Sequence, residues 1–121
     1  FTDASGAFYS AIDAEVDEVE GAFYAWKAEE LESILTNDEN GFLINFYALA
    51  DIPHFPGHKA NDGQVMVARM PLDEAARKFN APYVQIAAMT GQLMNKLLSV
   101  RNMRQAPALD NKVIVSWNGL M

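Results

Sequence analysis

Four side chains of different chemical types lie close together near the C-terminus. An acid, a base, an indole and an amide occur within nine consecutive positions, as Asp110, Lys112, Trp117 and Asn118. Polar groups at this density are typical of a binding site or of a buried hydrogen-bond network. A carboxylate and an amine are also groups that general acid–base chemistry uses. We therefore treat these four residues as candidate site residues.

Two roles are open for Trp117. An indole next to polar groups can stack on a sugar ring or on an aromatic ligand. It can instead belong to the core, with its N–H bonded to a partner. The surrounding segment has the pattern of a helix start whose apolar residues do not continue, and the chain begins at Phe1 rather than at Met. We therefore expect the chain to be a slice of something larger.

Arg101 and Arg104 lie three positions apart near the end of a predicted long helix. Cations at that place stabilise a helix by offsetting its C-terminal dipole. Because arginine forms bidentate pairs with carboxylates, the two guanidinium groups can instead build a rigid polar cluster with Asp110. Both interpretations stay open from the sequence.

An acidic segment between residues 13 and 21 resembles a calcium-binding loop only at its start. Its first acids alternate, at Asp13, Glu15 and Asp17. Glu18 then replaces the glycine that the turn needs, and Tyr24 replaces the bidentate glutamate. We therefore predict a solvated loop. Glu20 differs because it directly precedes Gly21 and an aromatic segment, and we expect a structured turn to hold it.

His54 and His58 do not form a predicted metal site. Pro56 and Gly57 lie between them, so the pair cannot share a helix face as zinc ligands would. A flexible surface loop is the expected structure there. The chain contains no cysteine, no Ser–His–Asp arrangement and no phosphate-binding glycine loop. The sequence therefore implies no metal and no cofactor, and the residues alone do not establish an enzyme.

Length and composition indicate one globular domain. The chain has 121 residues, of which 50% are hydrophobic. No run approaches the roughly 20 apolar residues of a membrane span. The net charge of −7 argues against nucleic acid as a partner. Residues 1–62 carry 13 acids and two bases, whereas residues 63–121 carry three acids and seven bases, so we expect the halves to attract each other. The absence of cysteine is compatible with the expected cytoplasmic location.

Five blocks of secondary structure are predicted. In chain order they are a β-hairpin (1–27), short helices (28–50), a loop and extended segment (51–70), helices (71–106) and the start of a further helix (107–121). The hairpin joins aromatic, alternating strands at 7–12 and 22–26. Between the short helices at 27–35 and 42–49, residues 37–41 are a predicted break.

Two later helices follow prolines, whose missing N–H costs nothing at a helix start. Pro71 opens the first, which runs to about Phe79. The second begins at Pro82 and runs to about residue 104. Its apolar face carries Ile86, Leu93, Leu97 and Val100. Residues 64–70 alternate and are predicted to be extended. The fold class is therefore mainly α with a small β-hairpin, that is, α+β.

Two blocks of sequence resemble a known family. They are 6–15 with 20–26, and Arg101, Arg104, Pro107, Asp110 and Lys112 with 116–121. Their order and separation are similar to those of the thioredoxin-domain-containing proteins related to spermatogenesis-associated protein 20. The resemblance covers nearly the whole chain, strongly at both ends and loosely from 36 to 80. Ala7 and Val16 depart from the family. Asn111 also departs, where an acid commonly precedes the lysine, and this puts a two-carboxylate mechanism through Asp110 in doubt.

The resemblance implies a fold and a place in a longer chain. Members of the family carry an N-terminal thioredoxin-like domain and then an α/α toroid similar to six-hairpin glycosidases and sugar 2-epimerases. This chain corresponds to the early part of the toroid, without the thioredoxin-like domain or its cysteine motif. Loops and short sheets at one end of such a toroid line a central pocket. A partial toroid leaves helix faces without partners, so we expect self-association through exposed apolar faces.

Two functional hypotheses follow from the resemblance. The first is a carbohydrate-active or carbohydrate-binding toroid, whose partner is a sugar-like small molecule. Its candidate substrate-binding residues are Glu20, Trp26, Arg101, Arg104, Asp110, Lys112, Trp117 and Asn118. The second is a non-catalytic scaffold that supports a thioredoxin-like domain or binds a protein client. Side chains that pair with each other favour the scaffold, whereas convergence on an open pocket favours a ligand. Neither nucleic acid nor a membrane is a predicted partner.

Overall fold

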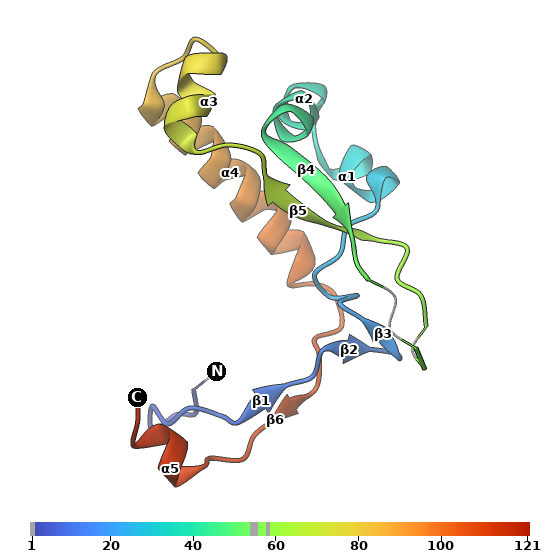
Figure 1. Ribbon diagram of the computed structural model, residues 1–121, viewed down its shortest axis with the longest axis vertical. Coiled ribbons are helices and arrows are strands. Elements are labelled where there is room, and N and C mark those ends of the chain that lie inside the picture. The colour runs from blue at the N-terminus through green and yellow to red at the C-terminus, as the bar shows by residue number, and fades with distance from the viewer. Residues whose placement is uncertain (1, 54–55, 58) are drawn as a thin grey trace.

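The computed structural model describes residues 2–53, 56–57 and 59–121, and its elements form two groups (Figure 1). The larger group, the body, contains α1 (Ala28–Ile34), α2 (Asn37–Phe46), β4 (Tyr47–Asp51), β5 (Gln64–Ala68), α3 (Leu72–Lys78) and α4 (Tyr83–Arg101). The smaller group, the arm, contains β1 (Ala11–Ile12), β2 (Glu15–Val16), β3 (Val19–Glu20), β6 (Leu109–Asp110) and α5 (Val115–Asn118). The arm brings the N- and C-terminal segments side by side, because β1 pairs with β6.

An apolar core lies inside the body, around the β4–β5 hairpin and the long helix α4. β4 and β5 pair antiparallel across all five residues of each strand. One face of α4 contributes the buried residues Ile86, Leu93 and Leu97, as predicted, and Val100 packs against them. The other core residues are Trp26, Leu31, Leu35, Phe42, Leu43, Phe46, Tyr47 and Ala75. Full burial of one large apolar side chain stabilises the fold by about 1.5–3 kcal/mol.

The bounds of α2 correct both the predicted break at 37–41 and the predicted helix at 42–49. α2 begins inside the predicted break, because a capping box fixes its first turn. The Thr36 hydroxyl accepts a hydrogen bond from the Glu39 N–H at 3.3 Å, and the Glu39 carboxylate accepts one from the Thr36 N–H at 2.8 Å. The helix ends at Phe46, and the following residues form β4 by pairing with β5. Strand pairing therefore outweighs the helical spacing there.

The predicted hairpin between 7–12 and 22–26 is wrong. β1 pairs with β6, and Trp26 forms a bridge to the start of β5, where its side chain is buried in the body. The hairpin of this region lies inside the acidic connection, where β2 pairs with β3. Asp17 and Glu18 form its two-residue turn with φ values of 54° and 67°, the left-handed values that a type I′ turn requires. This tight turn sets the register that the longer predicted loop would have left open.

The remaining helices follow the sequence pattern. α1 and α3 lie within the predicted ranges 27–35 and 71–79, and β5 lies within the predicted extended segment. α4 begins after Pro82 and ends at Arg101, slightly before its predicted end. Within 107–121 the helix start is the single turn α5, but the strand β6 before it was not predicted. The α+β class is confirmed. Across the described residues, no helix combines the length and apolar character that a membrane crossing requires.

Candidate functional site

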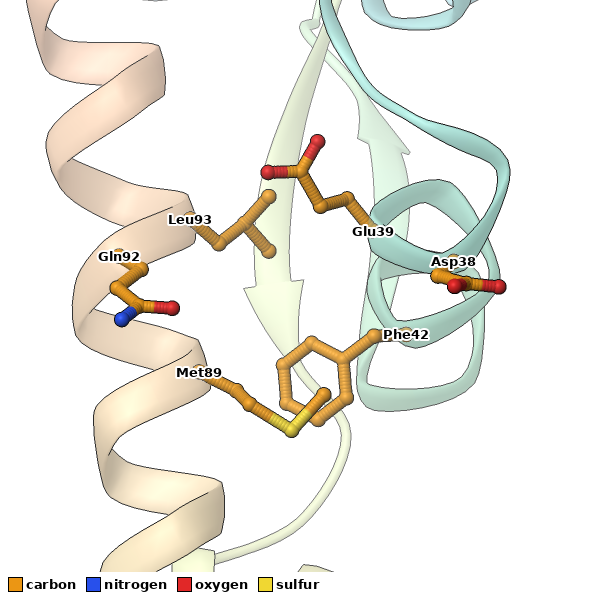
Figure 2. A pocket seen from close by; sticks show the side chains of 6 residues that line it. All are labelled: Asp38, Glu39, Phe42, Met89, Gln92 and Leu93. Carbon is orange, nitrogen blue, oxygen red and sulfur yellow. The ribbon is translucent and has the colours of Figure 1, made fainter.

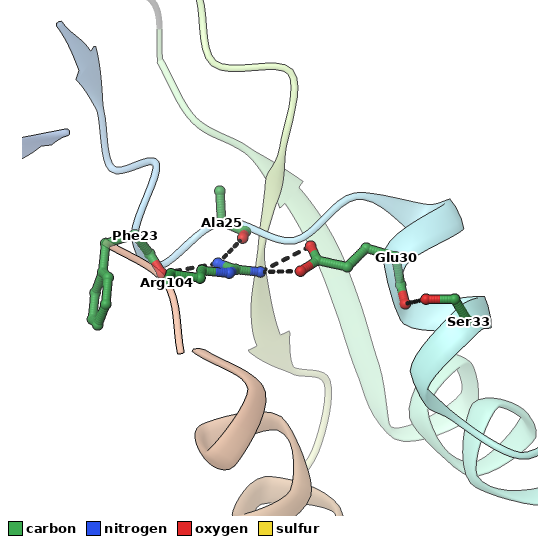
Figure 3. Close-up of polar contacts among 5 residues, drawn as sticks. All are labelled: Phe23, Ala25, Glu30, Ser33 and Arg104. Carbon is green, nitrogen blue, oxygen red and sulfur yellow. Dashed lines mark hydrogen bonds and ion pairs between the residues drawn. The ribbon is translucent and has the colours of Figure 1, made fainter. Parts of the chain in front are cut away.

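Arg104, just beyond α4, is the centre of a polar network (Figure 3). Its Nη1 donates hydrogen bonds to the carbonyl oxygens of Phe23 and Ala25 at 2.9 and 2.7 Å. Its Nη2 donates to both carboxylate oxygens of Glu30 at 2.7 and 2.8 Å. The side chains of Arg104 and Glu30 are 20% and 33% exposed, so water screens this pair less than an ion pair at the open surface. The network ties α1 and the segment before it to the end of α4.

Trp26 packs against the guanidinium group of this network. The residue is 3% exposed, and the guanidinium carbon of Arg104 lies 4.1 Å from the indole centroid. A cation over an aromatic face gains about 0.5–2 kcal/mol. Trp26 and Arg104 were predicted candidates, but Glu30 was not. An acid early in a helix interacts favourably with the helix dipole, and the sequence gives no sign of a partner 74 residues away.

Arg101 is the last residue of α4 and has different surroundings. Its guanidinium carbon lies 5.6 Å from the Phe23 ring centroid and 5.4 Å from that of Tyr24. Its Nε is buried and has no hydrogen-bond partner among the described residues. The side chain lines a groove of about 210 Å³ next to Trp26. Two arginines at one helix end therefore differ. Within the described residues, Arg104 bonds a carboxylate and two carbonyl oxygens, whereas the guanidinium group of Arg101 contacts aromatic rings.

Asp110 pairs with Lys112 and not with the arginines. The Lys112 Nζ donates to Oδ2 at 3.2 Å, and the Lys112 N–H donates to Oδ1 at 3.3 Å. The pKa of the Asp110 carboxyl lies below its ordinary value of 3.8, because the Ser10 hydroxyl and then Lys112 stabilise its charged form. The predicted cluster of both arginines with Asp110 is wrong. The β1–β6 pairing carries Asp110 into the arm, and Arg104 takes Glu30 as its acid instead.

Asn118 forms hydrogen bonds that join the N-terminal and C-terminal segments of the arm. Its Oδ1 accepts a hydrogen bond from the Phe8 N–H at 2.7 Å. Its Nδ2 donates to the carbonyl oxygens of Phe8 and Ile114 at 3.0 and 3.1 Å. These bonds use both hydrogens of the amide and one acceptor site. The neighbouring Trp117 is 56% exposed, so its indole is not part of the core that the 121-residue chain forms.

Glu20 lies beside a second groove, of about 250 Å³, at the junction of β3 and α1. Its carbonyl oxygen accepts a hydrogen bond from the Asn61 amide at 2.8 Å. Gly21 follows with a φ of 70°, which confirms the expected structured turn. The four charged residues that line the groove form two ion pairs, Lys27 with Asp62 at 2.6 Å and Arg104 with Glu30 at 2.7 Å. Their charges are therefore directed at each other.

A smaller depression, of about 120 Å³, lies between α2 and α4 (Figure 2). Phe42 and Leu93 form its apolar walls. Figure 2 shows the Asp38 carboxylate directed away from α4. The Glu39 carboxylate at its edge accepts a hydrogen bond from Lys96 at 2.6 Å. The two acids beside the depression therefore do not converge on its interior.

The structure thus separates the eight predicted candidates. Trp26 precedes α1, Arg101 ends α4 and Arg104 follows it. Glu20 lies in β3, whereas Asp110, Lys112, Trp117 and Asn118 lie in the segment from β6 to α5. The described part of the chain contains no group of three or more His, Asp or Glu side chains that could hold a metal ion. His54 and His58 lie outside the described residues.

Comparisons with known proteins connect the chain to long animal proteins. It is 28% identical to spermatogenesis-associated protein 20 of Mus musculus and of Homo sapiens, over 97% of this chain. It is 26% identical to an uncharacterised protein of Caenorhabditis elegans, over 95% of this chain. The chain spans 17% of the length of the mammalian relatives and 18% of the nematode relative. No family model and no solved structure matches it. The predicted resemblance is confirmed.

Proposed function

Because the chain is related to the spermatogenesis-associated protein 20 family, we propose that it is a scaffold segment of a longer protein. In this role it holds the arm in a fixed orientation on the body. The arm and body together then support a neighbouring domain, such as the thioredoxin-like domain that the resemblance implies, or bind a protein client. The observation that carries the proposal is the bidentate pairing of Arg104 with Glu30.

Support comes from how the candidate polar groups use their hydrogen-bonding capacity. Arg104 donates four hydrogen bonds to the chain itself, and Asn118 joins both ends of the arm. Asp110 bonds Lys112 two positions away. Groups that bond their own chain in this way define the geometry of a fold, whereas a ligand site leaves some polar groups directed into a cavity.

A double-mutant cycle on the 121-residue chain tests the scaffold role. Arg104→Met, Glu30→Gln and the double variant are compared by urea unfolding. We expect a coupling of about 1–3 kcal/mol, because removing either partner leaves the other charge partly buried and unpaired. The exposed pair of Arg77 with Asp73 on α3 is the control, and its coupling should stay below about 0.5 kcal/mol.

The scaffold and ligand hypotheses predict different behaviour of these variants. A scaffold residue acts through the fold, so Arg104→Met should lower stability and loosen the arm together. A ligand-binding residue acts on a bound molecule, so its removal should leave unfolding unchanged. Coupling between Arg104 and Glu30 that equals the exposed control would remove the main support for a scaffold.

A carbohydrate-binding role is the second proposal, and the exposed indole of Trp117 favours it. An exposed aromatic face is what stacking on a sugar ring requires. If a sugar binds, a panel of mono- and disaccharides should include one that raises the melting temperature, and Trp117→Ala should abolish the rise. When the unfolding is followed by tryptophan fluorescence, the buried Trp26 still reports it in the Trp117→Ala variant. The absence of any shift across the panel would contradict this proposal.

Self-association through the arm is a further part of the proposal. The arm exposes the large apolar side chains of Phe8, Leu109, Val113, Val115, Trp117, Leu120 and Met121. Contiguous apolar patches above a few hundred Å² are uncommon on monomers. Light scattering should therefore show an average mass that rises with concentration. A single monomeric mass at every concentration would contradict self-association.

A further inference from the structure

The groove next to Arg101 combines one cation with an apolar lining. It has a volume of about 210 Å³ and lies between α4, the middle of β5 and the segment that carries Trp26. Its lining side chains are Trp26, Met66, Met94, Asn95, Leu97, Leu98 and Arg101. Among these residues Arg101 bears the charge and Asn95 supplies an amide. All the others are apolar or aromatic.

Among the described residues, no acid forms an ion pair with Arg101, and its guanidinium group contacts aromatic rings instead. Two aromatic rings, those of Phe23 and Tyr24, lie 5.6 and 5.4 Å from the guanidinium carbon. Within the described residues, Nε is buried without a hydrogen-bond acceptor, so it has lost water and gained no partner. The terminal nitrogens are not buried in this way. An anion that reached them would complete the coordination that the aromatic rings leave open.

Arg104 shows within the same chain what a completed arginine site looks like. It also lies over an aromatic ring, that of Trp26, but both oxygens of Glu30 accept its hydrogen bonds. The aromatic contact is therefore common to both arginines, and within the part of the chain that the structure describes Arg101 has no carboxylate partner. A planar carboxylate is the anion whose geometry matches the fork of a guanidinium group.

The apolar part of the groove suits a flat ring. A cavity of about 150 Å³ is enough to hold benzene, so about 210 Å³ leaves room for a six-membered ring with a carboxylate attached. Met66 and Met94 border the groove, and methionine sulfur makes favourable contacts with the edges of aromatic rings. The thioether side chain is also flexible enough to adapt to the shape of a ligand.

We propose that this groove binds a small aromatic carboxylate, with its carboxylate on the terminal nitrogens of Arg101 and its ring between Met66 and Met94. This site goes beyond the scaffold role. It uses a residue that makes no bond in the Arg104 network, so the two proposals can fail separately.

Titration of the 121-residue chain with phenylacetate tests the site. The observable is the ¹³C-methyl NMR signal of each methionine. We expect saturable shifts at Met66 and Met94, with no shift at Met89, which borders the separate depression between α2 and α4. Phenylacetamide has nearly the same shape without the charge, and it should bind at least tenfold more weakly. Arg101→Met should weaken phenylacetate binding to the same degree.

The matched control is Arg77→Met, which removes an exposed arginine from α3 and should leave the titration unchanged. Equal affinity for the acid and the amide would overturn the proposal, as would shifts that persist in Arg101→Met or that never appear. If Arg101→Met does not fold, the comparison of phenylacetate with phenylacetamide on the unmodified chain tests the proposal. A negative titration result would not affect the measured coupling of Arg104 with Glu30. Absence of that coupling would likewise not affect the interpretation of this titration.

Discussion

Lys96 on α4 donates a hydrogen bond to Glu39 on α2 at 2.6 Å, although 57 residues separate them in the sequence. The same carboxylate oxygen accepts the N–H of Thr36, so one acid both starts α2 and holds it against α4. Lys96 comes from the basic part of the chain and Glu39 from the acidic part. The expected attraction between the halves is therefore realised at particular pairs, here and between Arg104 and Glu30.

Acid should destabilise the fold partly through Glu39. The pKa of its carboxyl lies below its ordinary value of 4.5, first because Lys96 donates to it and then because the Thr36 N–H does. A carboxyl whose pKa is lower when folded stabilises the protein above its unfolded pKa. This contribution is lost as the pH falls below about 4.5 and through the folded pKa. Urea midpoints measured from about pH 6 to 3 should therefore decrease.

Glu39→Gln separates this acid from the others. The variant cannot titrate at this position, so its stability should be lower at neutral pH and should fall less steeply with acid. Lys96→Met removes the main donor and should flatten the curve in the same way. A pH dependence in Glu39→Gln that matches the unmodified chain would contradict the assignment.

The capping box of α2 should account for a measurable part of its stability. Thr36→Ala removes the hydroxyl that accepts the Glu39 N–H, and we expect a loss of about 1 kcal/mol in the free energy of unfolding. Thr36→Ser keeps a hydroxyl at the same place and should stay within about 0.5 kcal/mol. Thermal unfolding followed by circular dichroism measures both. Equal losses in the two variants would show that the methyl group matters and the cap does not.

Two glycines should respond in opposite directions to the same substitution. At Gly63 a Cβ would lie 2.6 Å from the Cβ of Ala25, so Gly63→Ala must shift the backbone beside Trp26. We expect it to cost about 1–3 kcal/mol. Gly91 lies in α4 with no atom near an added Cβ, so Gly91→Ala should stabilise the helix by about 0.5–1 kcal/mol. Urea unfolding tests the pair, and the same sign for both would contradict the packing around Gly63.

Asn118→Asp should release the N-terminal segment of the arm. The change replaces the Nδ2 donor with an oxygen, which then faces the carbonyl of Phe8 and cannot bond it. Hydrogen exchange at the Phe8 amide should accelerate, while exchange in α4 stays slow. Asn45→Asp on α2 makes the same chemical change away from the arm and should not affect Phe8. Unchanged protection of the Phe8 amide from hydrogen exchange in Asn118→Asp would show that the hydrogen bonds of Asn118 do not hold the arm together.

The helices were largely predictable because their signals are local. The spacing of Ile86, Leu93 and Leu97 and the proline before α4 define that helix within a few residues. The strands were not predictable, because each depends on a partner elsewhere in the chain. Residues 7–12 and 22–26 share an alternating pattern, but their partners are β6 and the start of β5 rather than each other. Periodicity identifies an extended segment and does not name its neighbour.

The candidate site was predictable in its residue types and not in its pairs. The sequence singled out Arg104 and Trp26, which do contact each other. One of its two interpretations gave the arginine an acid six positions away, Asp110, whereas the structure supplies Glu30 from α1. Closeness in sequence is a poor guide here, because the chain turns into the arm between Arg104 and Asp110. Only the tertiary fold decides which of several acids a long, flexible cation reaches.

The pairing of β1 with β6 has a consequence for the order of folding. Ser10 and Asp110 bond each other across 100 residues, so joining them early would close a very long loop. The entropic cost of closing a loop grows with the logarithm of its length, and for a loop that long it is about 4 kcal/mol. The body consists of neighbouring elements and can assemble first at a much smaller entropic cost. We therefore expect the two chain ends to dock last during refolding and to separate first under a pulling force applied to them.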